Sequence, residues 1–157
     1  MISIGLDIST YVGIAKVAEN EFVGKALYFK EQTGLRRAEL LAQEVSRVLT
    51  NWHPDVVVIE AYAYGNHNSL VTLVEIGTIV RYHLYKIGIN WWEVPPTVLK
   101  KATCGRGNAS KDDMACSVKK LWGYSSPSDD VIDAFALAKM GLLISDGIEF
   151  KGVYRGY

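Results

Sequence analysis

Three short hydrophobic runs near the start of the chain predict an antiparallel meander. Residues 2–8 (ISIGLDI) are apolar and β-branched and end in a polar turn, which is the pattern of a buried strand. Two further runs follow at residues 12–18 and 22–29, and only a short Glu-Asn-Glu segment lies between them. Connections this short join antiparallel neighbours, so we expect the three runs to pair in one sheet.

The rest of the chain alternates between helical and strand patterns. Apolar residues recur at helical spacing from Leu35 to Leu49, and Pro54 follows as a stop signal. The run Val56–Ile59 ends in Glu60 and is typical of a strand buried on both faces of a sheet. The further predicted elements are a helix over residues 70–85, a strand over 89–94, and helices over 97–103, 111–121 and 128–144, the last with Ser128 as its N-cap. We therefore expect an α/β fold: a mixed five-stranded sheet, three antiparallel strands and then parallel ones, with helices on both faces.

Length and composition indicate one globular domain. A chain of 157 residues can form one core, and 49% hydrophobic with 22% charged residues is ordinary for a soluble protein. No apolar stretch approaches the roughly 20 residues of a membrane span, and we see no signal-peptide pattern. Cys104 and Cys116 match neither a disulfide framework nor a zinc motif. We expect a single domain over residues 1–157, located in the cytoplasm and without membrane contact.

The basic residues gather in one segment, although the net charge is +0. Between residues 100 and 120, only Asp112 and Asp113 oppose six basic side chains: Lys100, Lys101, Arg106, Lys111, Lys119 and Lys120. A local cluster of this kind can bind the phosphates of a nucleic acid. A solvated helix face has the same pattern, so both interpretations stay open.

Four carboxylates stand where an acid is costly. Asp7 lies at the end of the first apolar strand, Glu60 ends the Val-Val-Val-Ile strand, and Asp130 and Asp133 open the last helix. Residues three apart on a helix share a face and lie about 4.5 Å apart along its axis. Carboxylates brought together repel one another by on the order of a few kcal/mol, and a divalent cation between them removes this cost. Oxygen ligands without His or Cys favour Mg²⁺ or Mn²⁺, and a pair of such ions can cleave a phosphodiester bond.

Each acid also has a simpler interpretation. Asp7 could begin a turn, and Glu60 could be an exposed acid at a strand end. Asp129 and Asp130 could stabilise the helix N-terminus through its dipole. Asp133 is harder to explain in this way, because the apolar segment Ala-Phe-Ala-Leu-Ala follows it. The sequence does not decide which of Asp129 and Asp130 belongs to the set.

Four segments of the chain form an ordered set of motifs. They are Ile4 to Thr10 with Gly13, the Val-Val-Ile-Glu segment ending at Glu60, Pro96 to Lys111 with its Gly-Arg-Gly-Asn-Ala-Ser-Lys stretch, and Asp130 to Ala136. Any one segment is a weak signal, but the ordered set, which spans nearly the whole chain, is specific. It resembles the motifs of RuvC-type Holliday-junction resolvases, which are nucleases of the ribonuclease-H-like fold.

The resemblance implies an Mg²⁺-dependent endodeoxyribonuclease of DNA recombination and repair. Such an enzyme is a homodimer that cleaves four-way DNA junctions by paired nicks. The implied metal ligands are Asp7, Glu60, Asp130 and Asp133, holding two Mg²⁺ ions for which Mn²⁺ could substitute. The helix over residues 70–85 is apolar on more than one face, so it could be the dimer interface or a buried core helix.

The resemblance also implies contacts to branched DNA. Lys100 and Lys111 would meet the phosphate near the scissile bond, with Lys111 counted among the catalytic groups, and positive charge there would offset the charge of the transition state. Lys101 and Arg106 would add further DNA contacts. The simpler interpretation of both lysines is solvated surface, since Lys is mostly exposed.

The chain departs from the family pattern at two places. Ile8 and Ser9 stand where bacterial members usually carry Pro-Gly, so the first turn should differ. The aromatic residue expected three positions after the second acid falls on Ala63, but Tyr62 and Tyr64 flank it and could stack on an unpaired base. Both tyrosines could instead pack at a strand edge. The chain is also shorter and less basic than a typical bacterial member, which favours a phage protein or another divergent member in a bacterial or phage-infected cell.

Other functions are compatible with parts of the pattern. A related nuclease could act on flap or fork DNA or on RNA, because the surface around a site decides its substrate. A non-catalytic junction-binding protein would not need the complete set of acids. An actin-like ATPase or sugar kinase has a similar Gly-x-Asp-x-Ser/Thr hairpin but needs two lobes, and this length supplies one.

Overall fold

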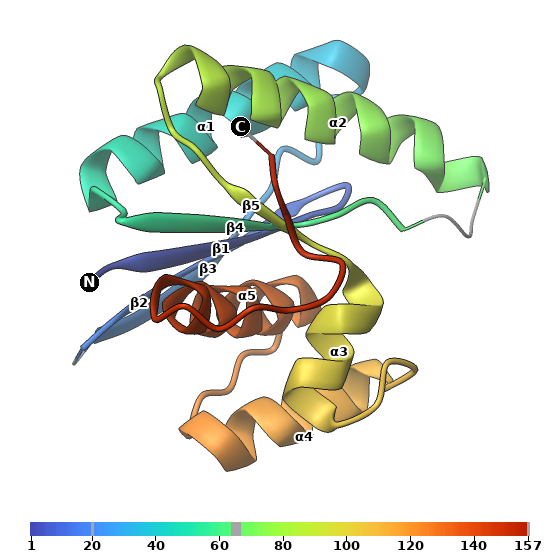
Figure 1. The fold of residues 1–157 in the computed structure, drawn as a ribbon. Coiled ribbons are helices and arrows are strands. Elements are labelled where there is room, and N and C mark those ends of the chain that lie inside the picture. The colour runs from blue at the N-terminus through green and yellow to red at the C-terminus, as the bar shows by residue number, and fades with distance from the viewer. Residues whose placement is uncertain (20, 64–66, 157) are drawn as a thin grey trace.

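A six-stranded sheet forms the centre of the computed structural model, which describes residues 1–19, 21–63 and 67–156, without the side chains of residues 67–69 (Figure 1). The strand order is β3-β2-β1-β4-β5-β6. The bounds are β1 (Ser3–Ile8), β2 (Val12–Ala18), β3 (Glu21–Leu27), β4 (Val56–Glu60), β5 (Trp92–Val94) and β6 (Tyr154–Arg155). β1, β2 and β3 pair antiparallel, β4 runs parallel to both β1 and β5, and β6 returns antiparallel to β5.

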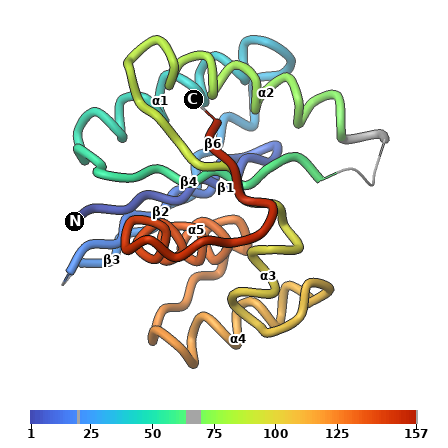
Figure 2. Tube along the Cα trace, in the orientation of Figure 1, coloured from blue at the N-terminus to red at the C-terminus, as the bar shows by residue number. Residues whose placement is uncertain are grey.

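Helices cover both faces of this sheet (Figure 2). α1 (Gly34–Trp52) and α2 (His67–Lys86) pack on each other over one face, and α5 (Asp129–Ser145) lies on the other. α3 (Pro96–Cys104) and α4 (Lys111–Trp122) pack beside α5. Among the described residues, no helix combines the length and the apolar character that crossing a membrane requires.

The alternation of side chains in the central strands decides which residues reach which face. Ile4 and Leu6 of β1 belong to the core between the sheet and the α1–α2 layer. Because successive side chains of a strand point to opposite faces, Gly5 and Asp7 face α5. The same alternation in β4 directs Glu60 to the α5 side. Both acids therefore project from one face of the sheet.

Helix α5 is buried on nearly all sides because it lies between the sheet and the α3–α4 pair. Its first turn is capped by Ser128, whose hydroxyl accepts from the amide of Val131 at 3.4 Å, as the sequence predicted. Small residues let it approach β1 closely: a Cβ added at Gly5 would collide with the carbonyl oxygen of Ala134 and lie 2.7 Å from the amide nitrogen of Ala138. This close approach fixes the head of α5 beside the end of β1.

The predicted fold is confirmed, with two differences at one edge of the sheet. The sheet has six strands instead of five, because Tyr154 and Arg155 pair with β5. A strand of two exposed residues has no periodicity by which the sequence could reveal it. The strand expected over 89–94 is shorter, because the amide of Ile89 donates to the carbonyl of Leu84 and continues the end of α2.

We expect Gly5→Ala to lower the free energy of unfolding by about 2–3 kcal/mol, because the new methyl group meets backbone atoms of α5 that can move only with the whole helix. Gly107→Ala, in the loop between α3 and α4, is the matched control, since its Cβ would come no closer than 3.1 Å to any atom. Urea unfolding of both variants measures the difference. Equal stability of the two variants would contradict a tight α5–β1 contact.

Candidate active site

Three carboxylates converge where β1, β4 and α5 meet. Leu6 of β1 pairs with Ile59 of β4 in parallel register, so the next residues, Asp7 and Glu60, stand side by side at the carboxyl ends of neighbouring strands. Asp133 reaches them from the second turn of α5. Each of the three offers a carboxylate oxygen, and these oxygens lie within 4.8 Å of one another. The grouping that the sequence predicted for these three acids is present in the structure.

Burial raises the pKa of all three groups, and repulsion from neighbouring carboxylates adds to each shift. Asp7 is only 7% exposed, and burial raises its pKa well above the usual value, with repulsion from Glu60 as the next cause. Burial also raises the pKa of Glu60, against the effects of a hydrogen bond from Asp7 and of the Lys100 charge. Burial raises the pKa of Asp133 to about 7, and Glu60 adds to the shift. Without a cation, such a site holds protons near neutral pH.

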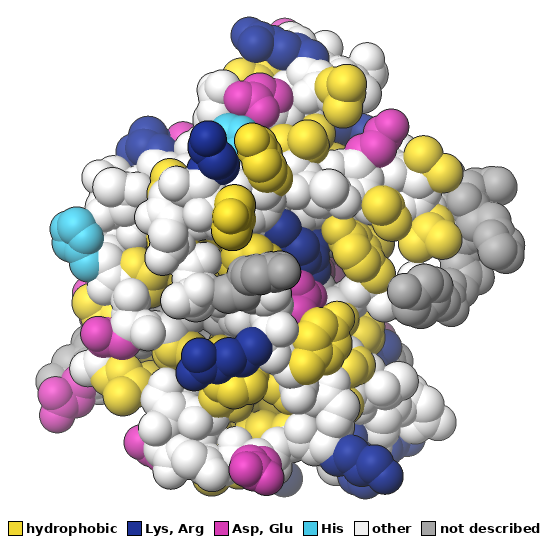
Figure 3. All heavy atoms as spheres, turned by 45° about the horizontal axis from the view of Figure 1, so that its top comes forward, with side chains coloured by type: hydrophobic (Ala, Val, Ile, Leu, Met, Phe, Trp, Pro, Cys, Tyr) yellow, Lys and Arg dark blue, Asp and Glu magenta, His cyan; other side chains and the backbone are white. Residues whose placement is uncertain are grey.

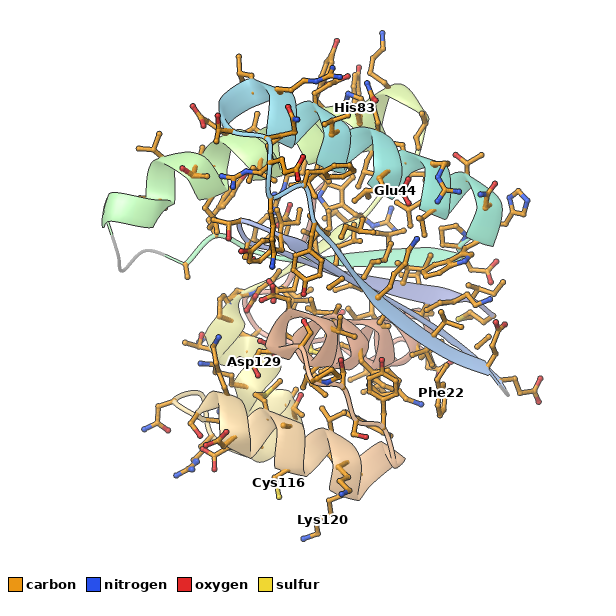
Figure 4. The ribbon with its side chains drawn as sticks, turned by 180° about the vertical axis from the view of Figure 1, so that it is seen from behind. Phe22, Glu44, His83, Cys116, Lys120 and Asp129 are labelled. Carbon is orange, nitrogen blue, oxygen red and sulfur yellow. The ribbon has the colours of Figure 1, made fainter. Side chains whose placement is uncertain are left out.

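Asp129 and Asp130, which the sequence could not separate, face different partners. Asp130 accepts a hydrogen bond from the Ser9 hydroxyl at 3.2 Å, and its charge raises the pKa of Asp7 and Asp133. Asp129 instead pairs with Lys111 at 3.1 Å between carboxylate oxygen and Nζ. Figure 4 shows Asp129 at the head of α5, on the side that carries α3 and α4. Asp130 is therefore the acid that faces the cluster.

A hollow of about 240 Å³ opens over the carboxylates. Its rim includes Lys100 of α3 and Lys111 at the start of α4, as well as Tyr62, which follows β4. Lys100 acts electrostatically on the cluster, since its charge lowers the pKa of Glu60 and of Asp133. These three residues place two lysine cations and one aromatic ring around an acidic floor.

Other predicted DNA-binding residues lie away from this hollow. Lys101 lines a different surface depression beside Lys151, and Arg106 forms an exposed ion pair with Asp113 at 2.6 Å. Asp113 also completes the capping box of α4, which explains why Arg106 is held there. Tyr64 lies outside the described residues.

Two residues of the site were not predicted as such. Ser9 lines the hollow and binds Asp130, and the only sequence signal was its place in a turn where the family pattern has glycine. Arg81 of α2 also lines the hollow. A single arginine in an apolar helical segment was the available signal, but its partner Glu93 is distant in sequence and gave no indication of the pair.

Comparisons with known proteins give consistent results. The family model of the crossover junction endodeoxyribonuclease RuvC matches residues 10–140. The RuvC of Chlamydia muridarum is 32% identical over 120 residues, covering 73% of this chain and 71% of that protein, and the RuvC of Synechococcus sp. (strain WH7803) is 27% identical over 110 residues, covering 69% and 71%. The structure of Thermus thermophilus RuvC in complex with a Holliday junction substrate superposes with a TM-score of 0.78 at 21% identity, covering 92% of this chain and 94% of that one.

We expect the metal-free protein to lose stability as the pH rises from about 4 to above 7. The folded pKa of Asp133 is about 7, above its unfolded value of 3.8, so in this window the unfolded state releases a proton that the folded state keeps. Asp133→Asn removes this contribution, and we expect it to raise stability at pH 8 by roughly 2–4 kcal/mol. Asp7 still titrates in the same direction, so the slope with pH is reduced but not abolished.

Urea unfolding in EDTA at pH 5 to 8 measures this effect. Asp112→Asn is the matched control, because Asp112 is an exposed acid on α4 outside the cluster. A wild-type protein whose stability does not fall faster with pH than that of Asp133→Asn would contradict the raised pKa of Asp133.

Proposed function

The chain belongs to the RuvC family of crossover junction endodeoxyribonucleases, and on that premise we propose that it cleaves four-way DNA junctions at a metal centre formed by Asp7, Glu60 and Asp133, with Asp130 as a further ligand. The observation that carries the proposal is the convergence of three carboxylates from three separate elements within 4.8 Å. The family match includes Glu60, Asp130 and Asp133. Asp7 precedes the matched residues, and we include it in the proposed metal centre because it lies beside Glu60.

The donor set fits hard divalent cations. Carboxylate oxygens without imidazole or thiolate favour Mg²⁺, and Mn²⁺ can replace it. The raised pKa values of Asp7 and Asp133 agree with this, since two cations would stabilise the charged forms that the metal-free site disfavours. When held by these carboxylates, two such ions would supply the activation of a water and the stabilisation of the leaving oxygen. The chain contributes the fixed positions of the carboxylates.

The residues of the rim would bind and orient the DNA. Lys100 and Lys111 would hold the phosphate over the carboxylates, where their charge offsets the negative charge of the transition state. Asp129 would keep Lys111 at the rim until phosphate takes its place. Tyr62 would stack on an unpaired base beside the cleaved strand. Lys101 and Arg106 remain predictions for contacts farther along the DNA.

A homodimer explains paired nicks, because one site cuts one strand. Val71, Val74 and Tyr82 of α2 are 67%, 39% and 55% exposed, although the opposite face of α2 is buried against α1. Hydrophobic side chains are exposed on this side of the molecule (Figure 3). An exposed apolar stripe on one helix can pack on its own copy across a twofold axis. We propose this stripe on α2 as the dimer interface. We also propose that the enzyme acts in the cytoplasm of a bacterial or phage-infected cell.

A cleavage assay with Mg²⁺ tests the activity on four substrates: a four-way junction, a fork, a linear duplex and an RNA–DNA hybrid. We expect the junction to be cut fastest. Asp133→Asn should slow its cleavage by at least about 10³-fold, because several kcal/mol of metal stabilisation are lost, while junction binding in EDTA stays nearly unchanged. Asp112→Asn should cut normally. Faster cleavage of the fork or the hybrid would assign the site to a different nucleic acid, and an active Asp133→Asn enzyme would refute the metal centre.

Light scattering tests the dimer. We expect Val74→Glu to weaken self-association by about 100-fold or more, because the twofold axis brings two like charges together in an apolar contact. Leu121→Glu is the matched control, since Leu121 is 55% exposed on α4, away from α2. A Val74→Glu protein that is as dimeric as the wild type would exclude this face as the interface.

A further inference from the structure

A buried ion pair joins α2 to β5 beside the hollow over the carboxylates. The guanidinium of Arg81 binds the carboxylate of Glu93 with two parallel hydrogen bonds, Nε to Oε1 at 2.6 Å and Nη2 to Oε2 at 2.7 Å. The side chains are only 14% and 6% exposed. Trp91 fixes the carboxylate further, because its Nε1 donates to Oε1 of Glu93 at 2.7 Å. The guanidinium therefore has a single defined position.

The same guanidinium contacts both residues that flank Ala61. Its Nη2 donates to the main-chain carbonyl oxygen of Glu60 at 3.2 Å. Its central carbon lies 4.5 Å from the ring centroid of Tyr62, which is the distance of a cation–π contact. Arg81 thus links the backbone of one carboxylate residue in the cluster with the aromatic ring at the rim of the hollow.

Gly77 makes this arrangement possible. A Cβ at Gly77 would lie 2.5 Å from the hydroxyl oxygen of Tyr62 and 2.8 Å from Nη1 of Arg81. The carbonyl of Gly77 accepts from Nη1 at 3.1 Å. The ring and the guanidinium therefore occupy space on α2 that is open because this position lacks a side chain.

Stability alone does not explain the ion pair. A buried pair of this kind loses much of its hydration energy, and apolar residues of similar volume are often equally stabilising at such positions. A lysine would supply the charge but not the planar fork that binds Glu93 at two points while lying against a ring. What an arginine alone supplies here is geometry, because its planar fork binds Glu93 at two points while it lies against the ring of Tyr62.

We propose that Arg81 is a positioning residue that sets Glu60 of the metal centre and Tyr62 of the DNA-contacting rim in one fixed relation. This inference rests on the proposed function for the roles of Glu60 and Tyr62. Loss of the fork should disturb metal binding and base stacking together, because Arg81 acts on both ligands through Glu60 and Tyr62.

Arg81→Lys tests this in two measurements. The first is the affinity for Mn²⁺ alone, without DNA, by isothermal titration calorimetry, and we expect it to be about tenfold weaker than in the wild type, as for other residues that orient metal ligands. The second is the fluorescence of 2-aminopurine at the crossover of a four-way junction bound in EDTA. Quenching by stacking should be present in the wild type and largely lost in the variant.

The matched control is Arg47→Lys, because Arg47 also forms a two-point pair, with Glu44 of α1, but lies away from the hollow. It should leave both measurements unchanged. If Arg81→Lys does not fold, the same two measurements on Gly77→Ala test the proposal. The added methyl group displaces Tyr62 and Arg81, while alanine itself favours the helix.

The proposal would be overturned if the folded Arg81→Lys protein bound Mn²⁺ and quenched 2-aminopurine as the wild type does. This holds even if its melting temperature fell, because the ion pair would then be structural only. If the wild-type protein does not bind the junction, the proposed function fails, and the Mn²⁺ titration still decides whether Arg81 positions Glu60.

Discussion

The close approach of α5 to β1 is the constraint on which the site depends. Gly5 leaves no room for a methyl group against the backbone of α5, and Gly13 of β2 stands equally close to the head of that helix. This packing holds Asp133 beside Asp7 although burial and repulsion both oppose the charged forms of the two acids. A dense core does not relax by small amounts, so the fold can keep together carboxylates that would separate on a flexible loop.

The sequence was sufficient for the parts of the site that interrupt an apolar pattern. Asp7 and Glu60 end buried strands and Asp133 precedes a run of small apolar residues, so each acid is conspicuous among its neighbours in the chain. The pattern could not distinguish Asp129 from Asp130, because that depends on the rotation of the first turn of α5. It also missed β6, since two residues show no periodicity.

The basic residues show why charge in a sequence does not translate directly into a binding surface. Lys111 pairs with Asp129 and Arg106 with Asp113, so part of the positive segment is neutralised within the protein. These exposed pairs are weak, and a phosphate can replace the carboxylate at little cost. A chain of net charge +0 can therefore present cations to DNA, because DNA phosphates replace the carboxylates as partners of its basic side chains. Lys100, which faces the buried cluster, differs because its charge acts on the clustered carboxylates themselves.

Helix α2 connects two features that are far apart in the sequence. One part of its surface buries Arg81 against β5, and through that guanidinium it contacts the main chain of Glu60. Its outer face exposes Val71, Val74 and Tyr82, the stripe to which we assign the dimer interface. Because the two surfaces belong to one rigid element, a shift of α2 on association would also move the guanidinium that orients the end of β4. In the proposed dimer, the geometry of each carboxylate cluster would therefore depend on the partner subunit, which would couple association to cleavage.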